Sequence, residues 1–327
     1  MTTSNLIKRV LPLVLSIAAI GTAQAAVPSF NLGAASNYSA YIFGNVSGVT
    51  DIEGRLAVGG NFSASGTSIG YRAPYGSTGP SMVVAGNVNL QSGNIYGPPL
   101  KNVDTNASIG PITEYTTNPY GKGVYGGSNT SSGYHNLKQT DISKVTDFKA
   151  AKTELSTLSN TLSKQASNGT SVNYRNSGIE LIGNGKSGVQ VFNLTTHDLT
   201  NLTLSNVGAD ATVLINVSGT GDVKFAGGQD GQLKALRANV LFNLNGATGV
   251  NIATGTWGSI LASNANLFGT GHLEGTVIAN SISSAVEVGW EPFKGYVAAP
   301  VPEPETYAML LAGLGLVGAV ARRRRQQ

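Results

Sequence analysis

The sequence predicts a mainly β protein whose short strands stack as the coils of a β-helix. Only 12% of the residues are charged, whereas glycine alone contributes 43 of 327. This composition is typical of all-β extracellular proteins with many tight turns. Short apolar stretches of alternating character end in Gly-Asn or Ser-Gly, and several of these stretches resemble one another. Repetition of one strand-and-corner unit indicates a solenoid.

The clearest repeats lie in the N-terminal third of the chain. The stretch 52–62 is echoed by 82–90, and Asn45, Asn61 and Asn87 each follow a glycine. Brief strands with Gly or Asn at the corners are what a β-helix coil requires. We expect inward side chains to stack into a narrow core, among them Leu56, Val58, Val83, Ile260 and Val277. A β-sandwich, which also alternates, is the alternative.

One segment, at about 147–166, has helical periodicity instead. Its apolar residues recur every three or four positions, at Phe148, Ala151, Leu155, Leu158 and Leu162. Asp147 is a suitable N-cap, and the pair Asn168-Gly169 is a suitable stop. We expect this amphipathic helix to pack on a flank of the β-helix; a helix that binds a partner is the alternative.

Further strands are predicted after the helix. Their ranges are 188–194, 202–204, 211–217, 222–225 and 239–244. Two more strands, 259–267 and 273–279, end this series. The second contains Leu273-Glu274-Gly275, which repeats the earlier Ile52-Glu53-Gly54. This echo suggests that the Glu-Gly step is a structural corner.

The N-terminal segment, 1–26, is predicted to be a cleavable export signal. A basic stretch ends in Lys8-Arg9, an apolar run follows from Val10 to Ile20, and Ala23-Gln24-Ala25 comes next. The small residues Ala23 and Ala25 suit signal peptidase. A buried N-terminal helix is the alternative, but it does not explain the ordered combination.

The C-terminal segment, 299–327, is predicted to be a sorting tail. Pro302-Glu303-Pro304 precedes an apolar run at 307–321, and the arginines 322–325 follow. This run is shorter than a comfortable spanning helix, which needs about 20 residues, so we expect a transient membrane stop. The arginines Arg322, Arg323, Arg324 and Arg325 would hold the end of the tail on the cytoplasmic side. The pattern resembles the PEP-CTERM signal of Gram-negative bacteria, which implies processing by an exosortase, often in bacteria that make exopolysaccharide.

The segment between these ends, 27–298, resembles the choice-of-anchor A family. The matching residues are 46–60, 82–93, 147–162, 213–219 and 258–279. That family is related to ice-binding-like and collagen-binding-like adhesive domains. The resemblance implies a right-handed β-helix with one long flanking helix and a role at the cell surface.

Catalytic and metal-binding chemistry is not predicted. The chain has no cysteine, which excludes disulfides and thiol chemistry. His135, His197 and His272 lie in separate segments without zinc-ligand spacing, and we expect each at the surface. Asp51 and Glu53 would share one strand face and could chelate an ion, but a solvated edge or a corner hydrogen bond is the favoured interpretation. We therefore predict no cofactor, metal or catalytic residue, and no enzyme.

The charge balance argues against nucleic-acid binding. Six of the 21 basic residues belong to the two terminal segments, which leaves 15 basic residues against the 17 acidic residues of the whole chain. A basic face for a phosphate backbone is therefore not indicated.

Tyrosines gather between residues 71 and 134, among Gly, Asn, Pro, Ser and Thr. Tyrosines on long loops offer a flat apolar face and a hydroxyl to a sugar ring or a protein. The candidates for ligand contact are Tyr96, Tyr115, Tyr120, Tyr125 and Tyr134. The alternative is that the loops bury these rings over the end of the β-helix.

Together these features predict an exported, non-enzymatic adhesive or structural module. It would lie in the envelope, at the surface or in the matrix of a Gram-negative bacterium. Its partners would be signal peptidase, an exosortase and extracellular polysaccharide or surface proteins. A β-helical enzyme acting on polysaccharide is the first alternative. Ice binding is less favoured, because the threonines near 195, 203 and 212 follow no fixed interval.

Overall fold

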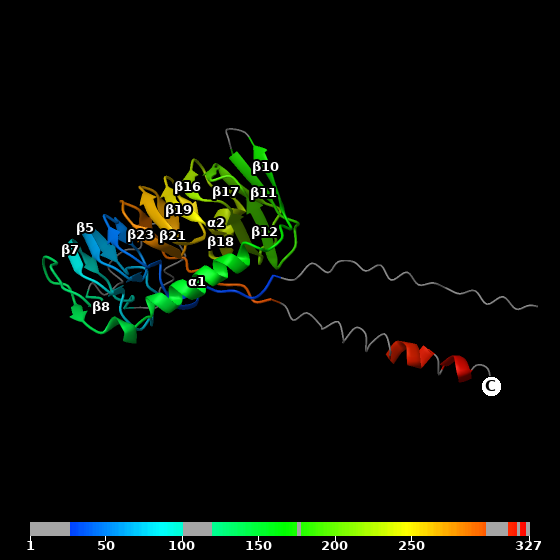
Figure 1. The fold of residues 1–327 in the computed structure, drawn as a ribbon, viewed down its shortest axis with the longest axis horizontal. Helices are drawn as coiled ribbons and strands as arrows, with labels where there is room; N and C mark the ends of the chain where they lie inside the picture. Colours follow the sequence, from blue (N-terminus) through cyan, green and yellow to red (C-terminus); the bar gives the residue numbers. More distant parts are fainter. Residues whose placement is uncertain (1–26, 101–119, 175–177, 299–312, 319–320, 325–327) are drawn as a thin grey trace, which may run out of the picture.

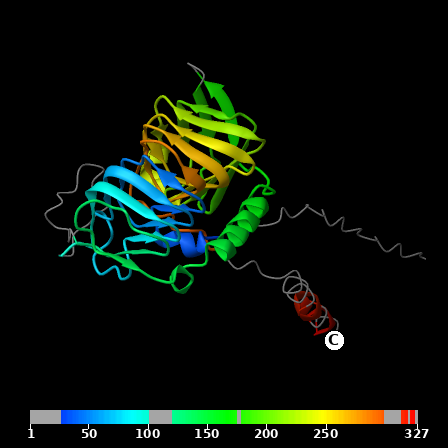
Figure 2. The ribbon, with the colours of Figure 1, turned by 60° about the vertical axis from the view of Figure 1, so that its left-hand side comes forward.

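A computed structural model describes residues 27–100, 120–174, 178–298, 313–318 and 321–324. The protein is mainly β, which confirms the predicted class. Most strands pair in parallel and form a stack, and one long helix, α1 (Phe148–Leu162), runs along it (Figure 1). The turned view places α1 against one side of this stack (Figure 2).

Among the described residues, the stack contains three parallel ladders. The first ladder runs β12 (Val189–Leu194), β15 (Thr212–Val217), β18 (Val240–Asn243), β21 (Ser259–Gly269), β23 (Val277–Ile282), β1 (Ala40–Ile42), β4 (Leu56–Val58), β6 (Met82–Val84), β8 (Gly123–Tyr125) and β9 (Leu137–Gln139). The second ladder runs β13 (Asp198–Thr200), β16 (Gly221–Ala226), β19 (Ala247–Ile252), β21, β23, β2 (Val46–Ser47), β5 (Phe62–Ile69) and β7 (Val88–Ile95). The third ladder runs β20 (Thr256–Trp257), β22 (His272–Glu274), β24 (Glu287–Val288), β3 (Asp51–Ile52) and β5.

Smaller elements complete the fold. A separate four-stranded sheet contains β10 (Thr170–Tyr174), β11 (Gly178–Ile182), β14 (Leu202–Ser205) and β17 (Asp230–Gly231). The short helix α2 spans Gln232–Leu236, and 3-10 turns span Gly33–Asn37, Ile142–Lys144 and Arg237–Asn239.

The order of strands in the stack differs from their order in the sequence. Strands β1 to β9 build one half and α1 follows. The other half is built by β12, β13, β15, β16 and β18 to β22. The last two strands lie between the halves. Strand β23 pairs with β21 on one side and with β1 and β2 on the other, and β24 pairs with β22 on one side and with β3 on the other. In Figure 1 the orange C-terminal strands accordingly lie beside the blue N-terminal ones. The C-terminal strands thus join the two halves.

The corners of the N-terminal half contain an asparagine ladder. Asn45 Oδ1 accepts the backbone N–H of Asn61, and Asn61 Oδ1 accepts that of Asn87, each at 2.8 Å. The preceding glycines make this possible, because a Cβ at Gly60 or Gly86 would lie 2.4 Å from the asparagine oxygen below it. The predicted Gly-Asn repeat is therefore a stacked corner.

The predicted core is mostly confirmed. Leu56, Val58, Ile260 and Val277 belong to the inner apolar cluster of the stack. The expectation for Val83 is wrong, since its side chain points outward, in register with Ala57. Neighbours on a strand point to opposite faces, and every residue of β6 is buried. The sequence of β6 is apolar at every position, so it does not show which side chains face the inner core.

Helix α1 covers a second apolar cluster, here called the helix seam. Asp147 caps the helix by accepting the N–H groups of Lys149 and Ala150, as predicted. The helix contributes Ala151, Leu155 and Leu162 to the seam. The strands contribute Tyr41, Ala57, Val83, Leu214, Leu241, Leu261 and Ile278. The expected docking of the helix on a flank of the strands is confirmed.

The two terminal segments lie mostly outside the described residues. The predicted signal peptide 1–26 and the sorting motif at 302–304 both lie outside them. Within the predicted tail, residues 313–318 and 321–324 are helical. Within the described parts of the chain, no helix has the length and apolar character needed to cross a membrane. The apolar helix 307–321 and the segment boundaries remain predictions.

Candidate functional site

The third ladder gathers an ionisable cluster, defined here as Glu53, Tyr71, Arg72, His272, Glu274 and Glu287. Strands β22, β24 and β3 lie side by side, with His272 opposite Glu287 and Glu287 opposite Asp51. The side chains of one row project from the same face of adjacent strands. The pairing thus brings together side chains from the N-terminal and C-terminal parts of the domain.

Arg72 and His272 link the carboxylates of the cluster. Arg72 Nη1 donates to Glu53 Oε2 and, at 2.8 Å, to Glu274 Oε1. His272 Nε2 lies 3.1 Å from Glu274 Oε1, and its Nδ1 lies 3.2 Å from Glu287 Oε2. The Tyr71 hydroxyl donates to Glu53 Oε1 at 3.0 Å. The result is a continuous polar network between the N-terminal and C-terminal strands.

Burial and pairing shift the pKa values in this cluster in opposite directions. Burial disfavours a charge on His272, but hydrogen bonds to Glu274 and Glu287 outweigh it and raise the pKa of His272 to about 10. Burial also opposes ionisation of Glu274, yet its bond to His272 and the charge of Arg72 hold its pKa below the usual range. The hydrogen bond to His272 lowers the pKa of Glu287. Burial raises the pKa of Glu53 despite Arg72.

The cluster corrects two expectations. Glu53 does not lie on a solvated edge, because it is 7% exposed and Glu274 is fully buried. The corner hydrogen bond expected as the other possibility is present at Asp51, whose Oδ1 accepts the Ser68 N–H at 2.7 Å. His272 is a half-buried ion-pair partner rather than a surface histidine. His135 and His197 are also half-buried, and their rings contact the backbone carbonyls of Ser132 and Ser218. Sequence reasoning missed Arg72 and Glu287. The repeated Glu-Gly step was interpreted only as a structural corner, although its two glutamates, Glu53 and Glu274, share the Arg72 guanidinium.

A second candidate is the outward side of the second ladder, here called the polar face. Lys224, Asn251 and Phe268 are in register on β16, β19 and β21, and Ser63 and Asn89 are in register on β5 and β7. The face continues through Ser47, Ser65, Gln91, Asp198, Asn266 and Ser281. All of these side chains are exposed or half-buried.

Hydrogen bonds within the polar face hold some of its side chains in place. Ser281 Oγ donates to Asn266 Oδ1 at 2.8 Å, and Asn266 Nδ2 donates to Ser283 Oγ at 2.8 Å. Neighbouring strands are about 4.7–4.9 Å apart. The face therefore presents amide and hydroxyl groups at a regular spacing along the stack.

The structure separates the predicted tyrosines. Tyr120 and Tyr134 are 64% and 76% exposed, and their rings form a T-shaped pair with centroids 6.0 Å apart. Tyr125 lies in β8 against the inner cluster, so the expectation that it stands on a long loop is wrong. Tyr96 is the first residue after β7 and is buried, which agrees with the alternative that these rings are covered. Tyr115 lies outside the described residues. Ligand contact by Tyr120 and Tyr134 remains a prediction.

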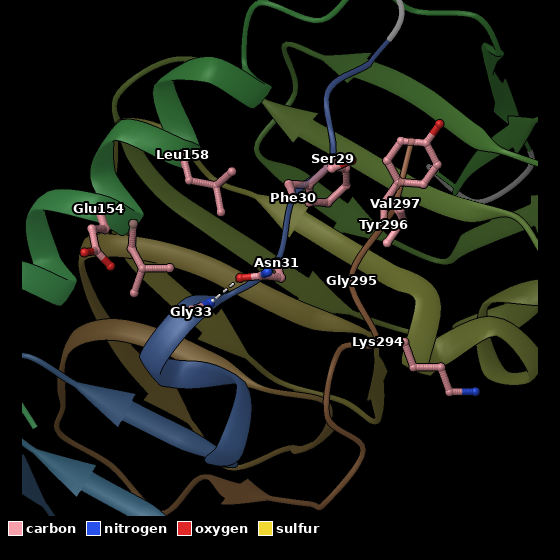
Figure 3. Close-up of a pocket in the computed structure, with 11 residues that line it drawn as sticks. Ser29, Phe30, Asn31, Gly33, Glu154, Leu158, Lys294, Gly295, Tyr296 and Val297 are labelled. Carbon is pink, nitrogen blue, oxygen red and sulfur yellow. Dashed lines mark hydrogen bonds between the residues drawn. The ribbon is translucent and has the colours of Figure 1, made fainter. Parts of the chain in front are cut away.

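A groove of about 410 Å³ lies between α1 and the two ends of the domain (Figure 3). Phe30 and Tyr296 exchange backbone hydrogen bonds at 2.9 and 2.8 Å, which pairs the two end segments. Leu155 and Leu158 line the groove from the helix. Its volume falls in the range of small-molecule sites. The predicted sorting tail follows directly after this paired segment.

Comparisons with known proteins place the chain in a family. Among solved structures it is similar to an ice-binding protein from the Antarctic ascomycete Antarctomyces psychrotrophicus, at 13% identity over 81% of this chain and 98% of that one, with a TM-score of 0.36. It is also similar to a glycosylated ice-binding protein from an Arctic yeast, at 14% identity over 84% and 96%, with a TM-score of 0.30. TM-scores this low do not establish a property of this chain.

No curated protein matches the sequence. Residues 300–325 match the PEP-CTERM protein-sorting motif. Residues 31–290 match a sequence family described as "Putative Ice-binding-like adhesive domain". The chain therefore belongs to this family of ice-binding-like adhesive domains and carries a PEP-CTERM sorting motif at its C-terminus.

Proposed function

We propose that the protein is an exported, non-enzymatic adhesive module whose polar face contacts extracellular polysaccharide. The family match and the sorting motif support export to the cell surface. We infer polysaccharide as the ligand class from the regular row of serine, asparagine and glutamine side chains on the polar face. Amides and hydroxyls exchange hydrogen bonds with sugar hydroxyls, and the half-buried ring of Phe268 can stack on a sugar face.

The finer parts of the proposal concern fold and sorting. The stack winds as a right-handed β-helix, a class supported by its three parallel ladders. Signal peptidase removes the segment 1–26, recognising Ala23 and Ala25, and an exosortase processes the tail near Pro302-Glu303-Pro304. The tail enters the membrane transiently. The mature protein then remains in the envelope or the biofilm matrix of a Gram-negative bacterium.

Retention on glycans tests the ligand class. The mature protein is passed over immobilised neutral and acidic polysaccharides, and the eluates are assayed for new reducing ends and unsaturated sugars. We expect retention on a neutral polysaccharide without product. The double variant Asn251→Ala with Phe268→Ala should lose retention, whereas Thr157→Ala, on the exposed side of α1, should keep it. Equal retention of both variants would contradict a role for the polar face.

The second candidate function is a polysaccharide-acting enzyme. The observation that favours it is the ionisable cluster, which combines three carboxylates with an arginine, a histidine and a tyrosine. Catalytic carboxylates of glycosidases work in pairs with opposed roles. New reducing ends or unsaturated sugars that disappear in Glu287→Gln would establish this alternative and overturn the adhesive proposal.

Ice binding is the least supported candidate. The polar face carries mixed serine, asparagine, lysine and aspartate side chains rather than a regular threonine array. Thermal hysteresis of a cooled protein solution would measure it, and we expect none.

A further inference from the structure

The ionisable cluster contains a group of metal-ligand atoms that the proposed function does not use. Glu53, His272 and Glu287 each offer one ligand atom, and these atoms lie within 4.8 Å of one another. The three residues come from the adjacent strands or strand ends of β3, β22 and β24. Paired strands fix the relative positions of their side chains, so the donors are held together by the stack itself.

A buried oxygen beside this group lacks a hydrogen-bond partner. Glu274 Oε2 is inaccessible to solvent and has no hydrogen-bond partner among the described atoms. It lies over Gly289, where a Cβ would come within 2.5 Å of it. Gly289 occupies the rung between Glu274 and Glu53 and follows Glu287 by two residues on the same face. An unpaired buried carboxylate oxygen is costly, and a cation in this space would satisfy it.

The charges of the cluster balance with a divalent ion. A coordinating histidine is neutral, which leaves the carboxylates of Glu53, Glu274 and Glu287 against the guanidinium of Arg72. The net charge of these four groups is then minus two, which one divalent cation offsets. Asp51, opposite Glu287 on β3, adds a further carboxylate beside the site. Arg72 stays between Glu53 and Glu274, on the deeply buried side. Half-exposed His272 and Glu287 give an ion access from solvent.

We propose that Glu53, His272 and Glu287 bind a divalent transition-metal cation of the zinc type, with Glu274 beside them. An imidazole nitrogen together with carboxylate oxygens suits Zn²⁺, whereas Ca²⁺ prefers a shell made of oxygens alone. The ion has a structural role, because its ligands belong to both the N-terminal and the C-terminal halves of the stack. The proposal does not depend on the polar face or on polysaccharide binding.

Titration of the chelator-treated mature protein with ZnCl₂ tests this site. We expect one Zn²⁺ per chain by calorimetry and a rise in the thermal unfolding temperature, since an ion that binds the folded state stabilises it. His272→Ala and Glu287→Gln should each weaken binding at least about tenfold, the lower end of the loss seen when even supporting groups are removed. The matched control His135→Ala removes a histidine outside the cluster and should bind Zn²⁺ like the wild type.

Several outcomes would overturn the metal site. These are the absence of stoichiometric Zn²⁺ binding, undiminished binding by the two cluster variants, or tighter binding of Ca²⁺ than of Zn²⁺. Circular dichroism checks that each variant folds. Should His272→Ala fail to fold, Glu287→Gln decides the question, because Glu287 is 37% exposed and its amide keeps the same shape. The Co²⁺ absorption spectrum of the wild type, compared with Glu287→Gln, gives a second readout of the ligands.

Discussion

The helix seam and the ionisable cluster perform the same structural task on different sides of the stack. The seam joins N-terminal residues such as Tyr41 and Val83 to C-terminal residues such as Leu241. The cluster joins Glu53 and Arg72 to Glu274. The first uses the burial of apolar surface, and the second uses charges and hydrogen bonds. We therefore expect the two connections to respond differently to pH, although both hold the same halves together.

The largest expected effect is in the cluster. Arg72→Ala leaves Glu53 and Glu274 buried without their shared cation, and loss of one partner from a buried ion pair costs about 3–5 kcal/mol. Urea unfolding of the folded variant measures this loss. Lys144→Ala is the control, because its pair with Asp141 is exposed, and we expect no measurable change. A small effect of Arg72→Ala would show that the cluster does not connect the halves.

Leu155→Ala tests the helix seam. Leu155 is 3% exposed, and truncation of a buried leucine costs about 2–5 kcal/mol. Because no charge is involved, the loss in unfolding free energy should be the same at pH 5 and pH 8. Thr157→Ala, on the exposed side of the same helix, should leave stability nearly unchanged. A loss that varied with pH would break the contrast between seam and cluster.

The pH dependence of stability should come from the cluster. In the metal-free protein the pKa of His272 is raised from 6.5 to about 10, so its contribution is complete below pH 6.5 and is lost as pH rises towards 10. The pKa values of Glu274 and Glu287 are lowered from 4.5, so their contribution is complete above pH 4.5 and is lost in acid. His272→Gln should therefore flatten the alkaline decline relative to the wild type.

That difference is measured by unfolding both proteins in urea from pH 5 to 10 with a chelator present. His135→Gln is the matched control and should follow the wild-type curve. Parallel curves for the wild type and His272→Gln would contradict the assigned role of the cluster.

The smallest expected effect is at the start of α1. Asp147→Ala removes the acceptor of two backbone N–H groups, and loss of such a cap costs about 1 kcal/mol. Asp147→Asn should retain most of that stability, since asparagine also caps well. Denaturant titration of the two variants checks this order. Equal stability of Asp147→Ala and the wild type would show that tertiary packing alone holds the helix end.

Local features of the chain were predictable from the sequence for a clear reason. The apolar spacing of α1, its cap at Asp147 and the Gly-Asn corners each depend on a few consecutive residues. A cap is a bond between near neighbours, and each corner needs a glycine with little room above it. The sequence alone therefore determined the helix, the mainly β class and the repeated corner.

Tertiary structure decided the orientation of Val83 and the composition of the ionisable cluster. Strand β6 is buried on both faces, so alternation could not show which residue faces the inner core. Glu53, Arg72, His272 and Glu287 met because β24 lies between β22 and β3. This contact joins the two ends of the domain and leaves no periodic trace in either segment. The site exists because the chain passes through α1 from one half of the stack to the other, and because the last strands pair with both halves.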